Sequence, residues 1–276
     1  MQLAFRKMHG AGNDFLVIDQ RRGELEVPAP EKIRELADRR TGIGFDQLMW
    51  IDPPRDDQSV AYYRVFNADG GESEQCGNGV RCVAWVIARD SGRTGDFTLG
   101  SLAGPIPVRI LGEDSFAASM GKPVLDPADI PFIADARAPL YALNVGGEAL
   151  SVSVLSMGNP HCVLEVDRLA DAAIDTLGPV LEMHERFPSR TNVGFMAIRS
   201  RGQIDLRVHE RGVGETRACG TGACAAVVAG RILDKLDEDV EVSLPGGRLM
   251  VSWPGELAPV WLSGDARLSF EGMLDI

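Results

Sequence analysis

Two segments of the chain are apolar around the whole circumference of a helix. The first, CGNGVRCVAWVIA, begins at Cys76, and the second, CGTGACAAVVAG, begins at Cys219. A helix that is apolar on every side must be buried on every side. Polar residues return at Arg89-Asp90 and at Asp234-Lys235, and Gly92 marks the end of the first segment. The pattern predicts two buried helices, each preceded by a Cys-Gly-x-Gly loop.

Most of the remaining apolar stretches have the short period of strands. YALNVGGEALSVSVLS predicts a hairpin about Gly146-Gly147, and VEVSLPGGRLMVSW predicts another about Gly246-Gly247. Two stretches have helical periodicity instead. APEKIRELADRRTG predicts an amphipathic surface helix that ends near Gly42, and DAAIDTLGPVLEMHERF predicts a helix interrupted at Gly178-Pro179.

The two halves of the chain repeat one another in spacing. The repeat has four pairs of landmarks, of which Cys76 and Cys219 are one. The other three are counted back from these cysteines: Asn13 and Asn159 lie 63 and 60 residues before them, Gln47 and Asn192 lie 29 and 27 residues before them, and Asn67 and Glu210 each lie nine residues before them. Such matched offsets indicate a duplicated domain with a period near half the chain. Strands around one apolar helix per half predict an α+β fold of two mixed barrels, with a boundary near 121–127.

Composition and charge limit the classes of partner. The chain has 276 residues, of which 45% are hydrophobic and 25% charged, and its formal net charge is −12. Such a chain repels nucleic acid and acidic membrane surfaces, and we find no basic run of five residues. It has no apolar stretch of about 18 residues and no apolar signal core near its N-terminus. We therefore expect a cytoplasmic protein without nucleic-acid or membrane partners.

The cysteine and histidine spacings argue against a metal site or a disulfide framework. The five cysteines are an odd number, and neither Cys-x-x-Cys nor His-x-x-x-His occurs. Cys82, Cys162 and Cys224 are most simply buried small hydrophobic residues. We expect no metal and no structural disulfide.

Matched cysteines at two helix N-termini indicate a particular chemistry. A helix N-terminus offers unpaired N–H groups and partial positive charge, which lower the pKa of a cysteine there and make it a better base. Two such loops suggest a cleft with a sulfur on each wall. One thiolate could remove a proton from a carbon while a thiol on the other side returns one, which inverts a stereocentre. The N–H groups of both helices could stabilise an adjacent carboxylate without a metal.

A run of motifs resembles one known family. MHGAGNDF, GIGFDQ, FNADG, CGNGVRC, GNPH, TNVGF, HERGVGET and ACGTGACA are similar, in order, to motifs of the diaminopimelate epimerases and cover residues 8–224. The resemblance implies two pseudo-symmetric domains, each a mixed β-sheet or barrel around a central buried helix, with residues 1–120 plus 264–276 in the first and 121–263 in the second. It implies a homodimeric enzyme that interconverts L,L- and meso-2,6-diaminopimelate without pyridoxal phosphate or another cofactor, for lysine and peptidoglycan precursors.

The resemblance also implies roles for individual residues. Cys76 and Cys219 match the acid–base pair, and His161 and Glu210 match residues that tune the thiols. The positions that match substrate-binding groups are Asn13, Gln47, Asn67, Gly77, Asn78, Asn159, Asn192, Glu210, Arg211, Gly220 and Thr221. Two positions depart from the family pattern. Gln75 replaces an apolar residue, and Phe270 replaces a tyrosine that supports the dimer, so the dimer contact does not follow from the resemblance.

Other interpretations remain open from the residues alone. A proline or hydroxyproline type of racemase would share the fold but would not need Glu210 and Arg211. A thiol redox protein or a cysteine hydrolase would leave the duplicated cysteine unexplained, and a pure binding module would make both thiols incidental. Taken singly, His161 could be a satisfied half-buried histidine, Arg211 a solvated charge, and the asparagines turn residues.

Overall fold

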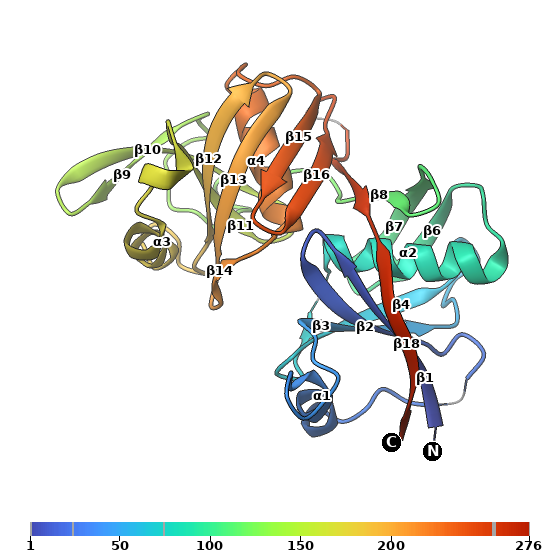
Figure 1. The fold of residues 1–276 in the computed structure, drawn as a ribbon. Coiled ribbons are helices and arrows are strands. Elements are labelled where there is room, and N and C mark those ends of the chain that lie inside the picture. The colour runs from blue at the N-terminus through green and yellow to red at the C-terminus, as the bar shows by residue number, and fades with distance from the viewer. Residues whose placement is uncertain (1, 24, 74, 256–257, 276) are drawn as a thin grey trace. The chain divides into compact units, whose positions relative to one another are not determined.

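The computed structural model describes residues 2–23, 25–73, 75–255 and 258–275. The chain forms two compact units, unit 1 (Met1–Ser119 with Ser263–Ile276) and unit 2 (Met120–Leu262). These bounds differ by one residue from the crossings expected at 120/121 and 263/264. Both units have an α+β fold in which strands predominate (Figure 1).

Unit 1 contains most of the N-terminal elements and the last strand. Its elements are β1 (Gln2–Gly10), β2 (Asn13–Asp19), α1 (Pro30–Ala37), β3 (Gln47–Asp52), β4 (Tyr62–Asn67), β5 (Glu72–Ser73), α2 (Gly77–Ser91), β6 (Phe97–Ser101), β7 (Gly104–Ile110), β8 (Ser115–Ser119) and β18 (Arg267–Asp275). The strand β17 (Trp261–Asp265) carries the chain from unit 2 into β18.

The strands of unit 1 close around α2. β1 is antiparallel to β18 and β2, β2 is parallel to β3, and β3 is antiparallel to β4. β4 is parallel to β6, and β6, β7 and β8 follow as antiparallel neighbours. β8 pairs with β17, which leads directly into β18 and so completes the ring.

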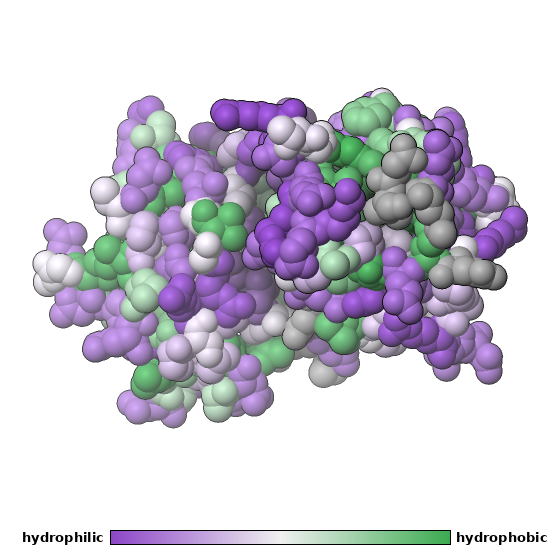
Figure 2. Space-filling view, turned by 90° about the horizontal axis from the view of Figure 1, so that it is seen from below, coloured by the Kyte–Doolittle hydropathy of each residue, from purple (hydrophilic) through white to green (hydrophobic). Residues whose placement is uncertain are grey.

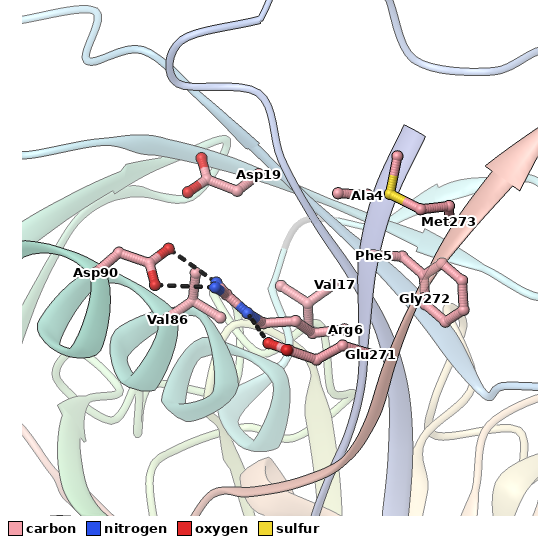
Figure 3. Close-up of a pocket in the computed structure, with 10 residues that line it drawn as sticks. All are labelled: Ala4, Phe5, Arg6, Val17, Asp19, Val86, Asp90, Glu271, Gly272 and Met273. Atoms are coloured by element: carbon pink, nitrogen blue, oxygen red, sulfur yellow. Dashed lines mark hydrogen bonds and ion pairs between the residues drawn. The ribbon is translucent and has the colours of Figure 1, made fainter. Parts of the chain in front are cut away.

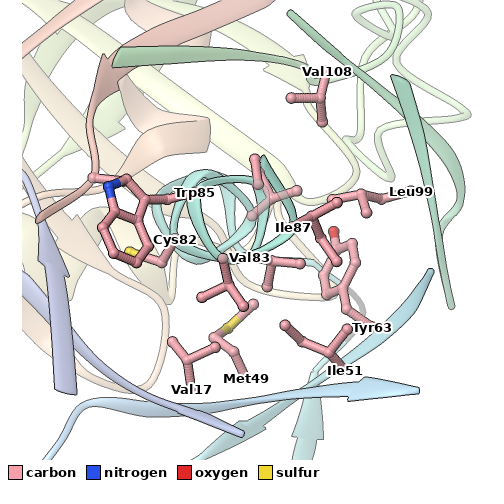
Figure 4. Packing of buried hydrophobic residues seen from close by; sticks show 14 of the residues in the cluster. Val17, Met49, Ile51, Tyr63, Cys82, Val83, Trp85, Ile87, Leu99 and Val108 are labelled. Atoms are coloured by element: carbon pink, nitrogen blue, oxygen red, sulfur yellow. The ribbon is translucent and has the colours of Figure 1, made fainter. Parts of the chain in front are cut away.

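The helix α2 occupies the centre of this ring, as its sequence predicts. Every residue from Gly77 to Ala88 is buried. Figure 4 shows Val83 and Cys82 on this helix facing Met49, Val17 and other side chains of the surrounding strands. The helix ends at Gly92, in the left-handed conformation with φ 64°. An apolar helix thus supplies the core against which the strands pack.

A second hydrophobic cluster lies on the outer side of the sheet in unit 1. There α1 places Ile33 and Leu36 against Trp50, Leu48 and Phe45. The amphipathic helix that the sequence predicts here is confirmed, but its regular part ends at Ala37, before Gly42. The sheet is therefore buried on both faces at this point, which fixes the strands that begin with the candidate site residues.

Unit 2 repeats the plan around α4. Its elements are β9 (Tyr141–Val145), β10 (Glu148–Ser156), β11 (Pro160–Glu165), the 3-10 helix η1 (Leu169–Asp171), α3 (Ile174–Glu182), β12 (Asn192–Ser200), β13 (Gln203–Glu210), β14 (Gly214–Thr216), α4 (Gly220–Ile232), β15 (Asp239–Leu244) and β16 (Gly247–Ser252). α4 contacts β10, β11, β12, β13 and β16, and its residues from Gly222 to Gly230 are buried.

The pairing of strands establishes the duplication. In unit 2, β10 and β11 are antiparallel, β11 and β12 parallel, β12 and β13 antiparallel, and β13 and β15 parallel. This is the order of β1, β2, β3, β4 and β6 in unit 1. The matched spacings in the sequence therefore correspond to equivalent strands and to equivalent helices, α2 and α4.

Two predicted details are wrong. The helix α3 continues through Gly178 and Pro179, because Ile174 and Leu181 are held in the core although Pro179 donates no backbone hydrogen bond. The last hairpin turns at Pro245-Gly246, since Leu244 pairs with Gly247. The hairpin about Gly146-Gly147 is confirmed, and both glycines have positive φ.

The surface is largely polar. In the face that Figure 2 shows, hydrophilic residues predominate and hydrophobic ones form small separate groups. None of the helices in the described part of the chain combines the length and apolar character that crossing a membrane would take.

Candidate active site

Three polar side chains of unit 1 lie at one edge of its sheet. Asn13 begins β2, Gln47 begins the parallel strand β3, and Asn67 ends the antiparallel strand β4, directly opposite Gln47. Asn13 follows a two-residue turn, Ala11-Gly12, in which both residues have positive φ. Because this conformation is strained for alanine, it indicates a turn held by its surroundings. The topology thus gathers residues that lie far apart in the sequence.

Cys76 stands at the same edge as the N-cap of α2. Its Sγ atom accepts a hydrogen bond from the Gly79 N–H at 3.4 Å and lies 3.9 Å from the Asn13 Oδ1 atom. The residue is half-buried, whereas the other four cysteines are buried. An N-cap sulfur meets the unpaired N–H groups of the first helical turn, which is the environment of a basic or nucleophilic cysteine.

The first turn of α2 is held rigidly. The guanidinium of the buried Arg81 donates to the Gly77 carbonyl at 3.0 Å and to the Asn78 Oδ1 atom at 2.9 Å. At Gly79 there is no room for a side chain, because a Cβ atom would lie 2.5 Å from the Met49 Sδ atom. The backbone N–H groups of Gly77 and Asn78 therefore have a fixed direction, as an anion site requires.

The hydrogen bonds of the amides decide which atoms they can offer to a ligand. Gln47 donates from Nε2 to the Asn67 Oδ1 atom at 2.9 Å, and this contact leaves the amide nitrogen of Asn67 available to a ligand. The Gln47 Oε1 atom is buried and accepts no hydrogen bond from the described residues. A buried acceptor without a partner is costly, so this atom points to a donor group on a ligand.

The equivalent edge of unit 2 carries Asn159, His161 and Asn192. His161 is the second residue of β11 and lies opposite Asn192, and its Nε2 atom lies 3.1 Å from the Asn159 Oδ1 atom. Burial, with a smaller effect of Arg211, lowers the pKa of His161 from 6.5 to about 3. A neutral imidazole that donates from Nε2 leaves the Asn159 amide N–H groups for a ligand.

Both polar atoms of the Asn192 side chain form hydrogen bonds within the protein. Its Nδ2 atom donates to the Pro160 carbonyl at 3.0 Å, and its Oδ1 atom accepts from the Arg211 N–H at 3.0 Å. The residue is buried. Its two polar atoms therefore fix the start of β11 and the turn after β13, and only a second hydrogen bond at either atom is left for a substrate.

Cys219 is the N-cap of α4, but its environment differs from that of Cys76. It is buried, and its Sγ atom lies 3.5 Å from the Thr221 Oγ1 atom. Burial first, and then the carboxylate of Glu210, raise the pKa of Cys219 well above its usual value. The helix N-terminus alone predicts a lowered pKa, and for Cys219 this prediction is wrong, because desolvation and a neighbouring anion outweigh the N–H groups.

The turn after β13 carries Glu210 and the exposed Arg211. Thr216 donates its hydroxyl to Glu210, and Arg211 donates from Nη1 to the Ser189 carbonyl at 3.0 Å. The turn is tied to α3 through Glu182, whose carboxylate accepts from the Gly212 N–H at 2.9 Å and contacts His209 at 2.9 Å. Glu210 and Arg211 are therefore neighbours in a backbone segment that these hydrogen bonds hold in place.

The structure thus gathers the predicted residues into one set in each unit. Unit 1 has Asn13, Gln47, Asn67, Cys76, Gly77 and Asn78, and unit 2 has Asn159, His161, Asn192, Glu210, Arg211, Cys219, Gly220 and Thr221. Phe270 lies apart, on β18. Cys82 and Cys162 are buried, and burial raises the pKa of Cys82 to about 12 and that of Cys162 further.

Sequence reasoning overlooked three residues that hold these sets in place. Asp46 contacts Asn13, Glu182 anchors the turn after β13, and Thr216 contacts Glu210. Asp46 and Thr216 lie inside motifs that the sequence singles out, whereas Glu182 carries no local signal. No group of three or more His, Cys, Asp or Glu side chains that could hold a metal occurs among the described residues.

The chain matches the family model of diaminopimelate epimerase over residues 5–125 and 153–268. It is 49% identical over its whole length to the full diaminopimelate epimerase of Thioalkalivibrio sulfidiphilus. It is also 48% identical to that of Alkalilimnicola ehrlichii, with 99% of this chain and 98% of the relative covered.

Solved structures share the fold at much lower sequence identity. A hydroxyproline epimerase from Agrobacterium vitis with bound trans-4-hydroxy-L-proline superposes with a TM-score of 0.70 at 13% identity, over 99% of this chain and 92% of that one. A phenazine biosynthesis protein of the PhzF family from Bacillus anthracis gives a TM-score of 0.68 at 14% identity over both full chains. These similarities support the two pseudo-symmetric halves.

Proposed function

The chain belongs to the diaminopimelate epimerase family, and we propose that it interconverts L,L- and meso-2,6-diaminopimelate without pyridoxal phosphate. The enzyme is an isomerase, and its reaction contributes to lysine biosynthesis. The observation that carries this proposal is the full-length identity of 49% to a diaminopimelate epimerase. The two cysteine-capped helices in equivalent positions of a duplicated fold support it further.

Two cysteines allow inversion at one carbon. The thiolate of one cysteine takes the proton from the α-carbon, and the electron pair of the broken C–H bond moves into the adjacent carboxylate. The thiol of the other cysteine then gives its proton to the opposite face, so that a new C–H bond forms and a thiolate is left. Cys76 and Cys219 exchange these roles with the direction of the reaction.

The reacting carboxylate needs stabilisation as negative charge develops on it. The N–H groups of Gly77, Asn78, Gly220 and Thr221 lie in the first turns of α2 and α4. Helix N-termini favour anions, and donors that are already oriented need no rearrangement during the reaction. Glu210 favours the thiol form of Cys219, and we propose that the neutral His161 also helps to set the protonation of the thiols.

Specificity follows from the end of the substrate that does not react. We propose that Glu210 binds its ammonium and Arg211 its carboxylate, with Asn67, Asn159 and Asn192 as neutral partners. The amide N–H groups of Asn67 and Asn159 are suited to a carboxylate, and the Gln47 Oε1 atom is suited to an ammonium. Binding this end rigidly supplies the orientation that the reacting carbon needs.

Arg211→Met tests this assignment. Loss of one partner of a charge pair in a closed site costs about 2–5 kcal/mol of binding free energy. We therefore expect kcat/KM to fall by roughly two to three decades. Arg199→Met is the matched control, since Arg199 pairs with Asp205 on the surface of the same unit. Equal losses in the two variants would contradict a specific role for Arg211.

A substrate panel separates this activity from that of the proline type of racemase. We expect diaminopimelate to exchange its α-hydrogen for deuterium in D₂O, measured by NMR, and to epimerise. Lysine, ornithine and proline should be very poor substrates, because they leave the partners of the second carboxylate unpaired. Turnover of proline or lysine comparable to that of diaminopimelate would overturn the proposal, and absence of exchange would favour a thiol hydrolase or a binding protein.

We also propose that the enzyme is a homodimer in which Phe270 takes the place of the family's tyrosine. β18 exposes three large apolar side chains, Leu268, Phe270 and Met273, and the Phe270 ring packs edge-on against Phe5 with centroids 6.1 Å apart. Exposed apolar side chains gathered on one strand favour a protein partner. A second copy is the simplest partner, because it presents the same strand.

The pocket beside β18 supports a protein partner over a small ligand. It has a volume of about 440 Å³. Figure 3 shows Arg6 paired with Asp90 and Glu271, and Asp19, which also lines the pocket, is paired with Arg21. Arg6 donates to both Asp90 oxygens at 2.8 and 2.9 Å and to Glu271 at 2.8 Å. These charges are already satisfied and would form a polar rim beside the apolar residues.

Phe270→Glu tests the dimer by analytical ultracentrifugation. A carboxylate in an apolar interface is unfavourable, so we expect the variant to sediment as a monomer at concentrations where the native protein is a dimer. Leu102→Glu is the control, because Leu102 is 60% exposed on the turn between β6 and β7. A monomeric native protein would disprove the dimer. A dimeric Phe270→Glu variant would show that the dimer contact does not include Phe270.

We further propose that the enzyme works in the cytoplasm. Its five cysteines are present as thiols, and the mechanism requires two of them to stay reduced. The cytoplasm keeps thiols in this state.

A further inference from the structure

The orientation of the Asn13 amide is fixed from the side away from Cys76. Its Nδ2 atom donates to the Asp46 Oδ2 atom at 2.5 Å. The backbone N–H of Asp14 donates to the same oxygen at 3.2 Å. One carboxylate oxygen therefore holds both the side chain of Asn13 and the backbone that follows it.

Asp46 is itself held by a network of charges. Its Oδ1 atom accepts from the Arg39 Nη2 atom at 2.7 Å, and its backbone N–H donates to the Asp14 carbonyl at 3.0 Å. Asp14 accepts from Arg39 at 2.7 and 3.0 Å and from the buried Lys7. Burial disfavours a charge on Asp14, but the hydrogen bonds from Arg39 and Lys7 outweigh it and lower the pKa of this carboxyl. The anchor of Asn13 thus has few alternative positions.

This anchor decides which amide atom Cys76 meets. Since the amide nitrogen is occupied by Asp46, the Oδ1 atom lies toward the sulfur, at 3.9 Å. An amide oxygen accepts a hydrogen bond from a thiol, whereas an amide N–H group would donate one to a thiolate. Rotation of the amide by half a turn would exchange these two situations.

The equivalent asparagine of unit 2 is held through its other polar atom. His161 contacts the Oδ1 atom of Asn159 at 3.1 Å, which leaves the nitrogen of that amide outward. The duplication therefore repeats the asparagine but not the direction of its amide. The anchor is a carboxylate in one half and a neutral imidazole in the other, so the two asparagines present different atoms.

We propose that Asp46 is a positioning residue of the epimerase, which holds Asn13 so that this amide presents a hydrogen-bond acceptor and not a donor to Cys76. The catalytic part of this inference rests on the proposed function, whereas its effect on the sulfur does not. Asp46 acts through Asn13 and does not itself touch the substrate.

Alkylation of Cys76 in the substrate-free protein tests the effect on the sulfur. Iodoacetamide reacts with the thiolate, and mass spectrometry of the Cys76 peptide follows the rate against pH. In Asp46→Ala the Asn13 amide can rotate, so we expect the midpoint of labelling to move to lower pH by about 0.5–1 unit. Asp46→Asn keeps a carbonyl acceptor for Asn13 and should stay within about 0.2 unit of the native midpoint.

Two further variants separate positioning from stability. Arg39→Gln removes the ion pair with Asp46 but leaves the Asp46–Asn13 contact, so its midpoint should match the native one. In an Asn13→Ala background, Asp46→Ala should cause no further shift, because the effect passes through Asn13. If Asp46→Ala fails to fold, Asp46→Ser replaces it, since its hydroxyl is too short to hold Asn13.

Kinetics complete the test. We expect Asp46→Ala to lose about tenfold in kcat with KM changed less than about threefold, and Asp46→Asn to recover most of the rate. A labelling midpoint equal to that of Arg39→Gln, or a shift that persists without Asn13, would overturn the proposal. A shifted midpoint in a protein that does not epimerise diaminopimelate would instead disprove the proposed function and leave the positioning role intact.

Discussion

A cysteine at the start of a buried helix is subject to opposing influences. The N–H groups of the first turn favour the thiolate, whereas loss of solvent and nearby carboxylates favour the thiol. Cys219 is buried beside Glu210, and its pKa is raised, while Cys76 is half-buried beside an amide oxygen. Matched positions in a duplicated fold therefore do not give matched thiols.

At this scale the two cysteines should be equally indispensable. We expect Cys76→Ala and Cys219→Ala each to lower epimerisation by about two to four decades, since neither sulfur can serve the other face. Serine variants should retain elimination from a β-halogenated analogue, which needs only one base. Cys82→Ala, which changes a thiol buried in the core, is the control. Near-native epimerisation by Cys76→Ala would rule out the two-base scheme.

His161 should make the protein sensitive to acid. Its pKa is about 3 in the folded protein against an ordinary value of 6.5. Between these values the unfolded chain binds the extra proton, so the free energy of unfolding falls as the pH drops, by roughly 1.4 kcal/mol per pH unit. We expect His161→Gln to show a shallower decline from pH 6 to 4.5 in urea denaturation. The control Met183→Gln, which changes an exposed side chain that does not titrate, should keep the native slope. A native slope in His161→Gln would contradict the assignment.

At the scale of elements, the two central helices begin alike and end differently. α2 ends in a left-handed glycine, with the Arg93 N–H bonded to the Ala88 carbonyl at 2.7 Å. α4 ends without a glycine, at Leu233, and Asp234 then adopts a positive φ of 55°. The N-termini carry the candidate chemistry and are duplicated, whereas the C-termini only need to satisfy their last carbonyls.

Gly92→Ala isolates the contribution of the cap on α2. Its φ is 64°, and a Cβ atom there would meet nothing within 4 Å, so the effect is conformational and not steric. We expect a loss of about 1–2 kcal/mol in the free energy of unfolding. Gly95→Ala is the control, because that position is equally open and has no positive φ. Equal stabilities of the two variants would show that the cap contributes nothing.

At the scale of the whole molecule, the chain leaves unit 1 and returns to it. β18 pairs with β1 from Gln2 opposite Asp275 to His9 opposite Arg267, and the Ala266 N–H is bonded to the Asp114 carbonyl at 2.8 Å. Unit 2 is a single continuous segment, whereas unit 1 needs both ends of the chain. The order in which the parts can fold follows from this difference.

Separate fragments test the dependence on β18. We expect residues 120–262 to fold alone, because their strands and core are complete within the segment. Residues 1–119 alone keep β2 beside β1 but lack β18, its other partner, and should stay unfolded until a peptide of residues 263–276 is added. Circular dichroism and NMR of each fragment would show this. A folded 1–119 fragment without the peptide would mean that β18 is dispensable for unit 1.

The sequence by itself determined the two central helices, the duplication and the residues at the strand ends. The apolar circumference after Cys76 and Cys219 is a local pattern. The offsets of Asn67 and Glu210 are equal because each residue ends its strand and is followed by one short strand and the loop before the central helix. Motif resemblance then supplied roles for those positions. Such signals lie within short stretches of chain and need no knowledge of what packs against them.

Only the tertiary structure decided the surroundings of those residues. Asn13 meets Asp46 across 33 residues, and His209 meets Glu182 across 27, through contacts that depend on strand register and helix packing. The burial of Cys219 beside Glu210, which reverses the effect of its helix N-terminus, likewise arises only once strands enclose α4. A pKa and the direction of an amide depend on every neighbouring group, and the sequence does not specify those neighbours one by one.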